Sequence, residues 1–235
     1  PVLALLAGAH GTEYASIVAL EKLIGEIDAK QLSGTVIILP LVNLPLFQKV
    51  VPHLNPTDGK NMNRMYPGKI DGTQTDRASY LITTQVVEQA DHVIDFHGGD
   101  IDESLRAYSY WSKTGRADQD AVSRGMVLAF GLDHIIVSAD RPKDPKDSRF
   151  FEYSASTRGM PSITVEAGHA GTVETDDVSA LVDGTLSVMR HLKMLPGSPR
   201  PTENPVWVDH LADVAAEQGG IFYPLVKRGA YVNAG

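Results

Sequence analysis

The strongest chemical signal in this sequence comes from two histidines and two glutamates, each of which follows an apolar run: His10, Glu13, His97 and Glu166. His10 and Glu13 form an H-x-x-E pair. At this spacing, on a tight turn or on the first turn of a helix, the two side chains face the same way. Two imidazoles and one carboxylate are a known ligand set for catalytic zinc, which keeps a fourth position for water. We therefore predict a mononuclear site with one Zn²⁺ per chain, held by His10, Glu13 and His97.

Strand ends are the elements that must position these side chains. Three segments share one layout, an apolar strand followed by polar residues flanked by glycine: LLAGAHGTE (5–13), VIDFHGGD (93–100) and ITVEAGHAG (163–171). In open α/β sheets, ligands bind beyond the carboxyl ends of the strands. If these strands are parallel neighbours, the two histidines and two glutamates meet in one crevice.

The whole chain alternates between apolar runs and segments of helical periodicity. This alternation predicts an α/β fold with a largely parallel or mixed sheet that is covered on both faces. The long stretch 43–78 is rich in Pro, Asn, Gly and Asp, and a loop of that length is usually functional. The expected strands are 1–8, 35–42, 92–96, 134–138 and 162–168, and the expected helices are 15–29, 77–89, 118–130 and 176–194.

The composition limits the partners and the kind of metal site. A formal net charge of −8 argues against nucleic acid and against an anionic membrane surface, because both attract clustered Lys and Arg. No apolar run reaches the roughly 18 residues that a membrane span needs. The absence of cysteine excludes disulfides and thiolate ligands, and it fits a cytoplasmic location. The net charge does not argue against a small anionic substrate, because a local Arg can dominate a pocket. Whether the chain forms a homo-oligomer stays open.

Four motifs in this order resemble the succinylglutamate desuccinylase/aspartoacylase family, which is related to the zinc carboxypeptidases. They are GAHGTE (8–13), NMNRMYPG (61–68), DFHGGD (95–100) and TVEAG (164–168). The resemblance spans roughly residues 1–200 and points to the bacterial branch that includes deacetylases of N-acetylated diaminobutyrate. It implies a three-layer α/β/α mixed sheet of zinc-carboxypeptidase type.

The same resemblance implies a division into domains. The catalytic domain would cover residues 1–200. The segment 195–205 carries four prolines and looks like a linker, and the pattern of 207–235 predicts short strands with turns. Since 219–235 resembles the opening of the family's smaller C-terminal β domain, we expect 201–235 to hold the linker and the beginning of that domain.

By position, the resemblance implies roles for further residues. Glu166 matches the general base and proton shuttle, and Asn63 and Arg64 match the pair that binds a substrate carboxylate. Arg suits that task because its planar fork meets a carboxylate through two hydrogen bonds. Many family members also carry an Arg shortly before this pair, where it steadies the oxyanion. Here the stretch has no such Arg, and His53 occupies the approximate place, with Lys60 as another cation.

Weaker candidates surround these positions. Asp95 lies one strand period before His97, so it is expected on the same face, where it would hydrogen-bond a ligand histidine or be satisfied by nearby backbone. His169 would orient Glu166, line the pocket or be structural. Asn43 would brace the loop or touch substrate.

These observations predict a zinc-dependent hydrolase that cleaves the amide bond of a small N-acyl amino acid or N-acyl diamino acid. One alternative is a metallocarboxypeptidase acting on short peptides, because the same site serves both reactions. A second alternative is a non-catalytic protein that binds a small molecule. A dinucleotide site is excluded because GAHGTE lacks the G-x-G-x-x-G spacing.

Overall fold

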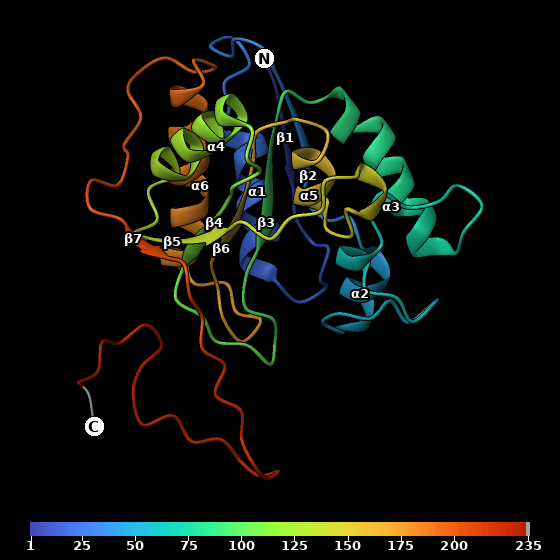
Figure 1. The fold of residues 1–235 in the computed structure, drawn as a ribbon, viewed down its shortest axis with the longest axis vertical. Coiled ribbons are helices and arrows are strands. Elements are labelled where there is room, and N and C mark those ends of the chain that lie inside the picture. The colour runs from blue at the N-terminus through green and yellow to red at the C-terminus, as the bar shows by residue number, and fades with distance from the viewer. Residues whose placement is uncertain (234–235) are drawn as a thin grey trace.

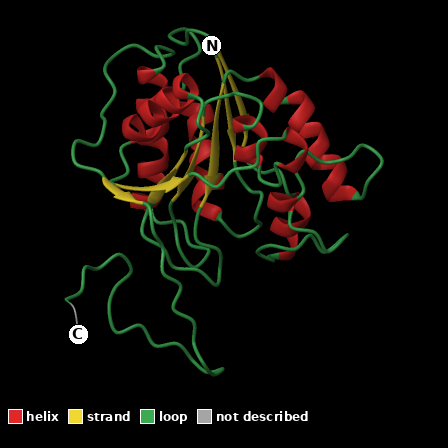
Figure 2. Cartoon of the chain, in the orientation of Figure 1, coloured by secondary structure: helices red, strands yellow, loops and turns green. Residues whose placement is uncertain are grey.

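A computed structural model describes residues 1–233 and confirms the α/β prediction. Helices pack on both faces of a single mixed sheet (Figures 1 and 2). The strands are β1 (Val2–Leu6), β2 (Thr35–Leu39), β3 (His92–His97), β4 (Tyr108–Ser112), β5 (His134–Ser138), β6 (Ser162–Glu166) and β7 (Val206–Val208). The α-helices are α1 (Tyr14–Glu26), α2 (Leu44–Lys49), α3 (Gln74–Gln85), α4 (Ala117–Phe130), α5 (Phe151–Ser156) and α6 (Thr175–His191).

The sheet runs in the order β2-β1-β3-β6-β4-β5-β7. The first four strands in this order, β2, β1, β3 and β6, are mutually parallel. The carboxyl ends of β1, β3 and β6 therefore lie at one edge of the sheet, as expected from the sequence. Strand β4 pairs antiparallel with β6, and β5 and β7 continue parallel to β4. Strand β4 was not among the expected strands, because YSYWS carries polar residues between aromatic ones and no apolar run.

Alternation along β1 separates two hydrophobic cores. Leu3 and Leu5 face a cluster that includes residues of α1, α4 and α6, whereas Ala4 and Leu6 face a second cluster that includes residues of α3 and α5. This two-residue period is the expected signature of a strand covered on both faces. Figure 1 shows the resulting three layers, with α1, α4 and α6 on one side of the sheet and α3 and α5 on the other.

The stretch 43–78 is not one unstructured loop. It contains α2, a 3-10 turn at Met62–Arg64 and the start of α3. Asp58 joins the middle of this stretch to the first turn of α3, accepting hydrogen bonds from the backbone N–H and the hydroxyl of Thr75 at 2.8 Å each. The segment that carries Asn63 and Arg64 is thereby tied to a helix, although its sequence lacks periodicity.

The end of the chain differs from the expected run of short strands. One strand, β7, forms there, and it extends the main sheet beside β5 instead of starting a separate one. From residue 209 to residue 233 the chain forms neither helix nor strand (Figure 2). The proposed division at residue 200 therefore stays a prediction. Within residues 1–233, no helix is long and apolar enough to cross a membrane.

Candidate metal and substrate site

The turn between β1 and α1 places His10 and Glu13. Gly8 adopts φ +70°, and a Cβ there would lie 2.8 Å from the side chain of Leu41, so glycine is needed at this position. Asn43 is buried, and its amide donates to the carbonyl of Ala9 at 3.2 Å. It braces the turn, which is one of the two roles expected from the sequence.

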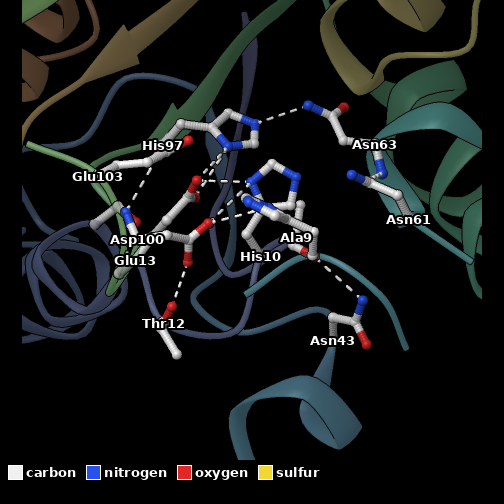
Figure 3. A network of polar contacts seen from close by, with 12 residues as sticks. Ala9, His10, Thr12, Glu13, Asn43, Asn61, Asn63, His97, Asp100 and Glu103 are labelled. Atoms are coloured by element: carbon white, nitrogen blue, oxygen red, sulfur yellow. Dashed lines mark hydrogen bonds and ion pairs between the residues drawn. The ribbon is translucent and has the colours of Figure 1, made fainter. Parts of the chain in front are cut away.

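Three side chains converge at the edge of the sheet (Figure 3). His10 Nδ1 lies 2.7 Å from Glu13 Oε1, and His97 Nδ1 lies 3.0 Å from Glu13 Oε2. One donor atom from each residue falls within 4.8 Å of the other two. Glu13 and His97 are buried, whereas His10 is partly exposed. The turn after β1 and the end of β3 thus bring Glu13 and His97, 84 residues apart in the sequence, together with His10.

The chemistry of these donor atoms fits a zinc ion. Two imidazole nitrogens and a carboxylate leave room for a fourth ligand, which is the arrangement of catalytic zinc. Burial raises the pKa of the Glu13 carboxyl, but the positive charges of His97 and His10 outweigh it and bring the pKa to about 2. Glu13 is therefore an anion at neutral pH, as a metal ligand must be.

The far side of the His97 ring has its own partners. His97 Nε2 lies 3.3 Å from Asp95 Oδ1 and 3.2 Å from Asn63 Nδ2. A carboxylate behind a ligand imidazole fixes the ring's orientation and raises its basicity. Asp95 thus occupies the place that its strand period predicted, on the same face as His97.

Glu166 ends β6 beside the metal-ligand candidates. In the parallel pairing of β3 and β6 it stands opposite His97. Burial raises the pKa of Glu166 well above its ordinary value; the charge of His97 opposes this shift, while Glu13 and Asp95 add to it. A carboxyl whose pKa lies above its ordinary value holds a proton more readily, which suits a proton shuttle that must return the proton it takes.

Asn63 and Arg64 approach from the 3-10 turn. The side-chain oxygen of Asn63 accepts a hydrogen bond from the backbone N–H of Phe151 at 3.2 Å. This bond fixes the orientation of the Asn63 amide, with its nitrogen toward His97. Arg64 Nη1 donates to the backbone carbonyl of Asn63 at 2.6 Å, and its guanidinium lies 4.4 Å from the centre of the Phe150 ring. The guanidinium is therefore held in place with further donors left for a ligand.

All but one of the predicted site residues line one cavity of about 640 Å³. The exception is His53. Its Nδ1 lies 3.2 Å from Asp100 Oδ2, and its ring packs edge-on against His10 with centroids 5.0 Å apart. His53, Asp100 and His10 form a second group with metal-ligand spacing, but His10 is common to both groups. His53 is therefore placed behind His10, and its suggested role at the oxyanion stays a prediction.

His169 does not join the site. His169 Nε2 pairs with Glu174 at 2.6 Å on the surface, which gives it the structural role that the sequence left open.

Several residues that line the cavity were not predicted from the sequence: Glu103, Tyr108, Tyr110, Arg141, Glu152 and Tyr153. Tyr108 and Tyr110 lie on the unexpected strand β4, and the phenol oxygens are 3.4 Å apart. Their spacing of two is the signal that places them on one face once the strand is recognised. Arg141 and Glu152 are distant in sequence from every motif, and only tertiary structure brings them to the cavity.

Known proteins match this chain in sequence and in fold. The model of the succinylglutamate desuccinylase/aspartoacylase catalytic domain matches residues 1–192. N-alpha-acetyl-L-2,4-diaminobutyric acid deacetylase of Halomonas elongata is 27% identical over 210 residues, which cover 89% of this chain and 60% of that protein. The chain thus spans less than two thirds of the length of this curated relative.

Solved structures agree with this match. A succinylglutamate desuccinylase/aspartoacylase from Rhodobacter sphaeroides superposes with a TM-score of 0.77 at 27% identity, covering 85% of this chain and 57% of that one. The product-bound ectoine utilization protein EutE (DoeB) from Ruegeria pomeroyi shares the fold, with a TM-score of 0.76 at 24% identity over 88% of this chain and 61% of that one. From the family match and the shared fold, we conclude that this chain belongs to the succinylglutamate desuccinylase/aspartoacylase family and contains its catalytic domain.

Proposed function

We propose that this chain carries the active site of a zinc-dependent deacylase, which hydrolyses the amide bond of small N-acyl amino acids, N-acyl diamino acids included. The observation that carries the proposal is the convergence of His10, Glu13 and His97 beside Glu166 in one cavity. The deacetylase activity named for the Halomonas elongata relative supports this reaction class.

The zinc ligands in this proposal are His10 Nδ1, a Glu13 oxygen and His97 Nδ1, the atoms that face one another in the structure. When bound, zinc supplies a Lewis acid that polarises the acyl carbonyl and makes water a better nucleophile at neutral pH. Asp95 holds the His97 ring from behind, so the imidazole keeps its Nδ1 toward Glu13.

Glu166 transfers the proton from the attacking water to the leaving amine. As a carboxylate it takes a proton from the attacking water, and as a carboxylic acid it returns that proton to the leaving amine nitrogen. Its partly buried position and the neighbouring carboxylates favour the protonated form, which suits the second step. The charge of His97 favours the ionised form, which suits the first.

Arg64 and Asn63 fix the amino-acid half of the substrate. Arg64 reaches the cavity as a guanidinium that stacks on Phe150, and it offers a substrate carboxylate two parallel hydrogen bonds. A substrate anchored at its carboxylate and at its acyl carbonyl has its scissile bond held in one orientation, which lowers the entropic barrier to attack.

The test combines metal analysis with turnover on the purified protein. The panel would hold N-acetyl and N-succinyl amino acids, N-acetyl-diaminobutyrate and a set of short peptides. About one zinc per chain and chelator-sensitive release of the acyl acid from the N-acyl compounds is the expected result. Preferential cleavage of the peptides would instead support the carboxypeptidase alternative. A zinc-loaded protein that binds these compounds and cleaves none of them would support the non-catalytic one.

A further inference from the structure

A second group of metal-binding side chains lies beside the predicted zinc ligands, and only one of its members is used by the proposed function. The group consists of His53, Asp100 and His10, and one donor atom of each falls within 4.8 Å of the other two. Imidazole nitrogens and carboxylate oxygens both bind divalent cations. His53 and Asp100 do not line the catalytic cavity, so these two residues lie outside the space that a substrate would fill.

Asp100 is held with one oxygen toward the two imidazoles. Its side chain is 0% exposed, and its Oδ1 accepts a hydrogen bond from the Thr12 hydroxyl (Figure 3). Its Oδ2 lies 3.2 Å from His53 Nδ1 and 4.0 Å from His10 Nδ1, yet it accepts no hydrogen bond from any described residue. A buried carboxylate oxygen without a donor is costly. A divalent cation held between this oxygen and the imidazoles would satisfy it.

Exposure to solvent decreases from this group toward the predicted zinc ligands. The His53 side chain is 36% exposed and that of His10 is 12% exposed, whereas Glu13 and His97 are only 3% and 4% exposed. A metal site needs an entry path, because its ligands must be reached from solvent. An ion that approaches from the His53 side meets that residue first and reaches His10 before the two buried ligands.

His10 belongs to both groups through one nitrogen. Its Nδ1 lies 2.7 Å from Glu13 Oε1 and 4.0 Å from Asp100 Oδ2. A neutral imidazole has a single acceptor nitrogen with one lone pair, which binds one cation at a time. The two groups therefore cannot both use His10 Nδ1 at once, and an ion would occupy them one after the other.

We propose that His53 and Asp100 form a loading site for the divalent cation, which captures the ion from solvent together with His10 and passes it on to Glu13 and His97. The inference rests on the proposed zinc site and concerns the route by which that site is filled and emptied. A cleft that carries a carboxylate raises the local concentration of cations and their rate of association. The loading site thus gives solvent ions rapid access to two ligands that are themselves buried.

The rate of zinc uptake tests the proposal without any measurement of turnover. Metal-free full-length chain is mixed with Zn²⁺ in a stopped-flow instrument, and a fluorescent zinc indicator follows the free ion. His53→Gln should slow association about 10-fold. Release of zinc to a chelator should slow by the same factor, because an ion that leaves crosses the same step. The Kd should therefore stay nearly unchanged.

Two further variants complete the kinetic test. Asp100→Asn should also slow uptake, and it keeps an oxygen that can accept from the Thr12 hydroxyl. His134→Gln is the matched control, because His134 Nδ1 likewise lies near a carboxylate, 2.9 Å from Asp133, but His134 does not line the cavity and belongs to neither metal-binding group. Its uptake rate should equal that of the unaltered protein. Circular dichroism melting checks that each variant keeps the fold.

A second experiment detects the loading site directly. In His97→Ala the buried ligand set is incomplete, so Co²⁺ titration followed by visible absorption should report weak binding at the group that contains His53. Adding Asp100→Asn to this variant should lower the Co²⁺ affinity about 10- to 100-fold. Adding Glu13→Gln instead should lower it much less. The reverse order of these two effects would place the residual ion at Glu13 and contradict the proposal.

Uptake at the unaltered rate in both His53→Gln and Asp100→Asn would overturn the loading site, and the contact between these residues would then be an ion pair with a protonated imidazole. A slower association without an equally slower release would overturn it as well, since the residues would then only support the zinc ligands. Failure of the unaltered protein to bind zinc would refute the zinc site and the loading site together. Zinc binding that the variants leave unchanged refutes the loading site alone.

Discussion

His97 and Glu166 stand opposite each other in the parallel pairing of β3 and β6, each as the last residue of its strand. A metal-ligand candidate and a proton-shuttle candidate are thus delivered by two neighbouring strands whose backbone hydrogen bonds fix their relative position. Strands position side chains more exactly than loops do, and proton transfer depends on such placement.

Replacement of Glu166 by Gln should separate metal binding from turnover. The amide keeps the size of the side chain but can neither take nor return a proton, so kcat should fall by about 10²- to 10⁴-fold. Zinc content should stay near one per chain, because Glu166 is not among the three ligand candidates. Steady-state kinetics on the best substrate of the panel, with metal analysis of the same sample, measure both quantities.

Near-native turnover of a zinc-loaded Glu166→Gln protein would show that another group carries the proton. Glu103→Gln is a matched control, since Glu103 also lines the cavity but is exposed and belongs to no strand. Its kcat should change far less than that of the Glu166 variant.

Removal of a ligand candidate should abolish zinc binding. In His97→Ala the third donor atom is lost and Glu13 faces only His10, so purified protein should hold zinc well below one per chain. His169→Ala is the control, because that histidine pairs with Glu174 on the surface. Equal zinc contents of the two variants, measured by atomic emission after dialysis, would contradict the proposed ligand set.

Asp95→Asn should weaken zinc binding without removing a ligand. The carboxylate lies 3.3 Å from His97 Nε2, and loss of such a partner commonly lowers metal affinity by about 10- to 100-fold. Competition with a chromogenic chelator gives the affinity directly. Asp102→Asn, an exposed change close by in sequence, should leave it unaltered. An unchanged affinity in Asp95→Asn would assign the carboxylate a purely structural role.

The layout of the site is predictable from the sequence because it follows from strand ends. An apolar run followed by glycine and a polar residue marks both the element and the functional edge, so the sequence alone places His10, His97 and Glu166 together. Asp95 follows from the period of two along β3. Both signals are local patterns, which can be recognised in a single sequence.

The rest of the cavity depends on contacts between distant segments, which no local pattern encodes. Arg141 follows β5 and meets Glu152 from α5 only because β5 lies beyond β4 in the sheet. Strand β4 itself lacks an apolar run because two of its aromatic residues face a cavity instead of a core. The distance of His53 from Asn63 along the chain suggests a place at the oxyanion, whereas the fold turns its ring toward Asp100.

The loop that presents Asn63 and Arg64 should lose stability in acid through Asp76. Asp76 Oδ2 accepts from the ammonium of Lys60 at 2.5 Å and from the backbone N–H of Thr73 at 2.9 Å, so it joins the loop to the first turn of α3. Burial raises the pKa of Asp76, but the hydrogen bonds from Lys60 and Thr73 outweigh it and leave the pKa below its ordinary value of 3.8.

Because the folded state lowers this pKa, the carboxylate stabilises the fold above pH 3.8, and the contribution is lost as the pH falls below that value. Asp76→Asn should therefore cost about 1 kcal/mol near neutral pH, the usual cost of losing such a helix-start contact. For a chain of this size the melting temperature falls by about 2–4 °C. Melting curves of both proteins between about pH 3 and about pH 7 should draw closer toward the acid end, since the unaltered protein then begins to lose the same contact. Asp71→Asn, an exposed change in the same loop, controls for net charge. A difference that persists undiminished at the acid end would mean that Asp76 acts through packing and not through its charge.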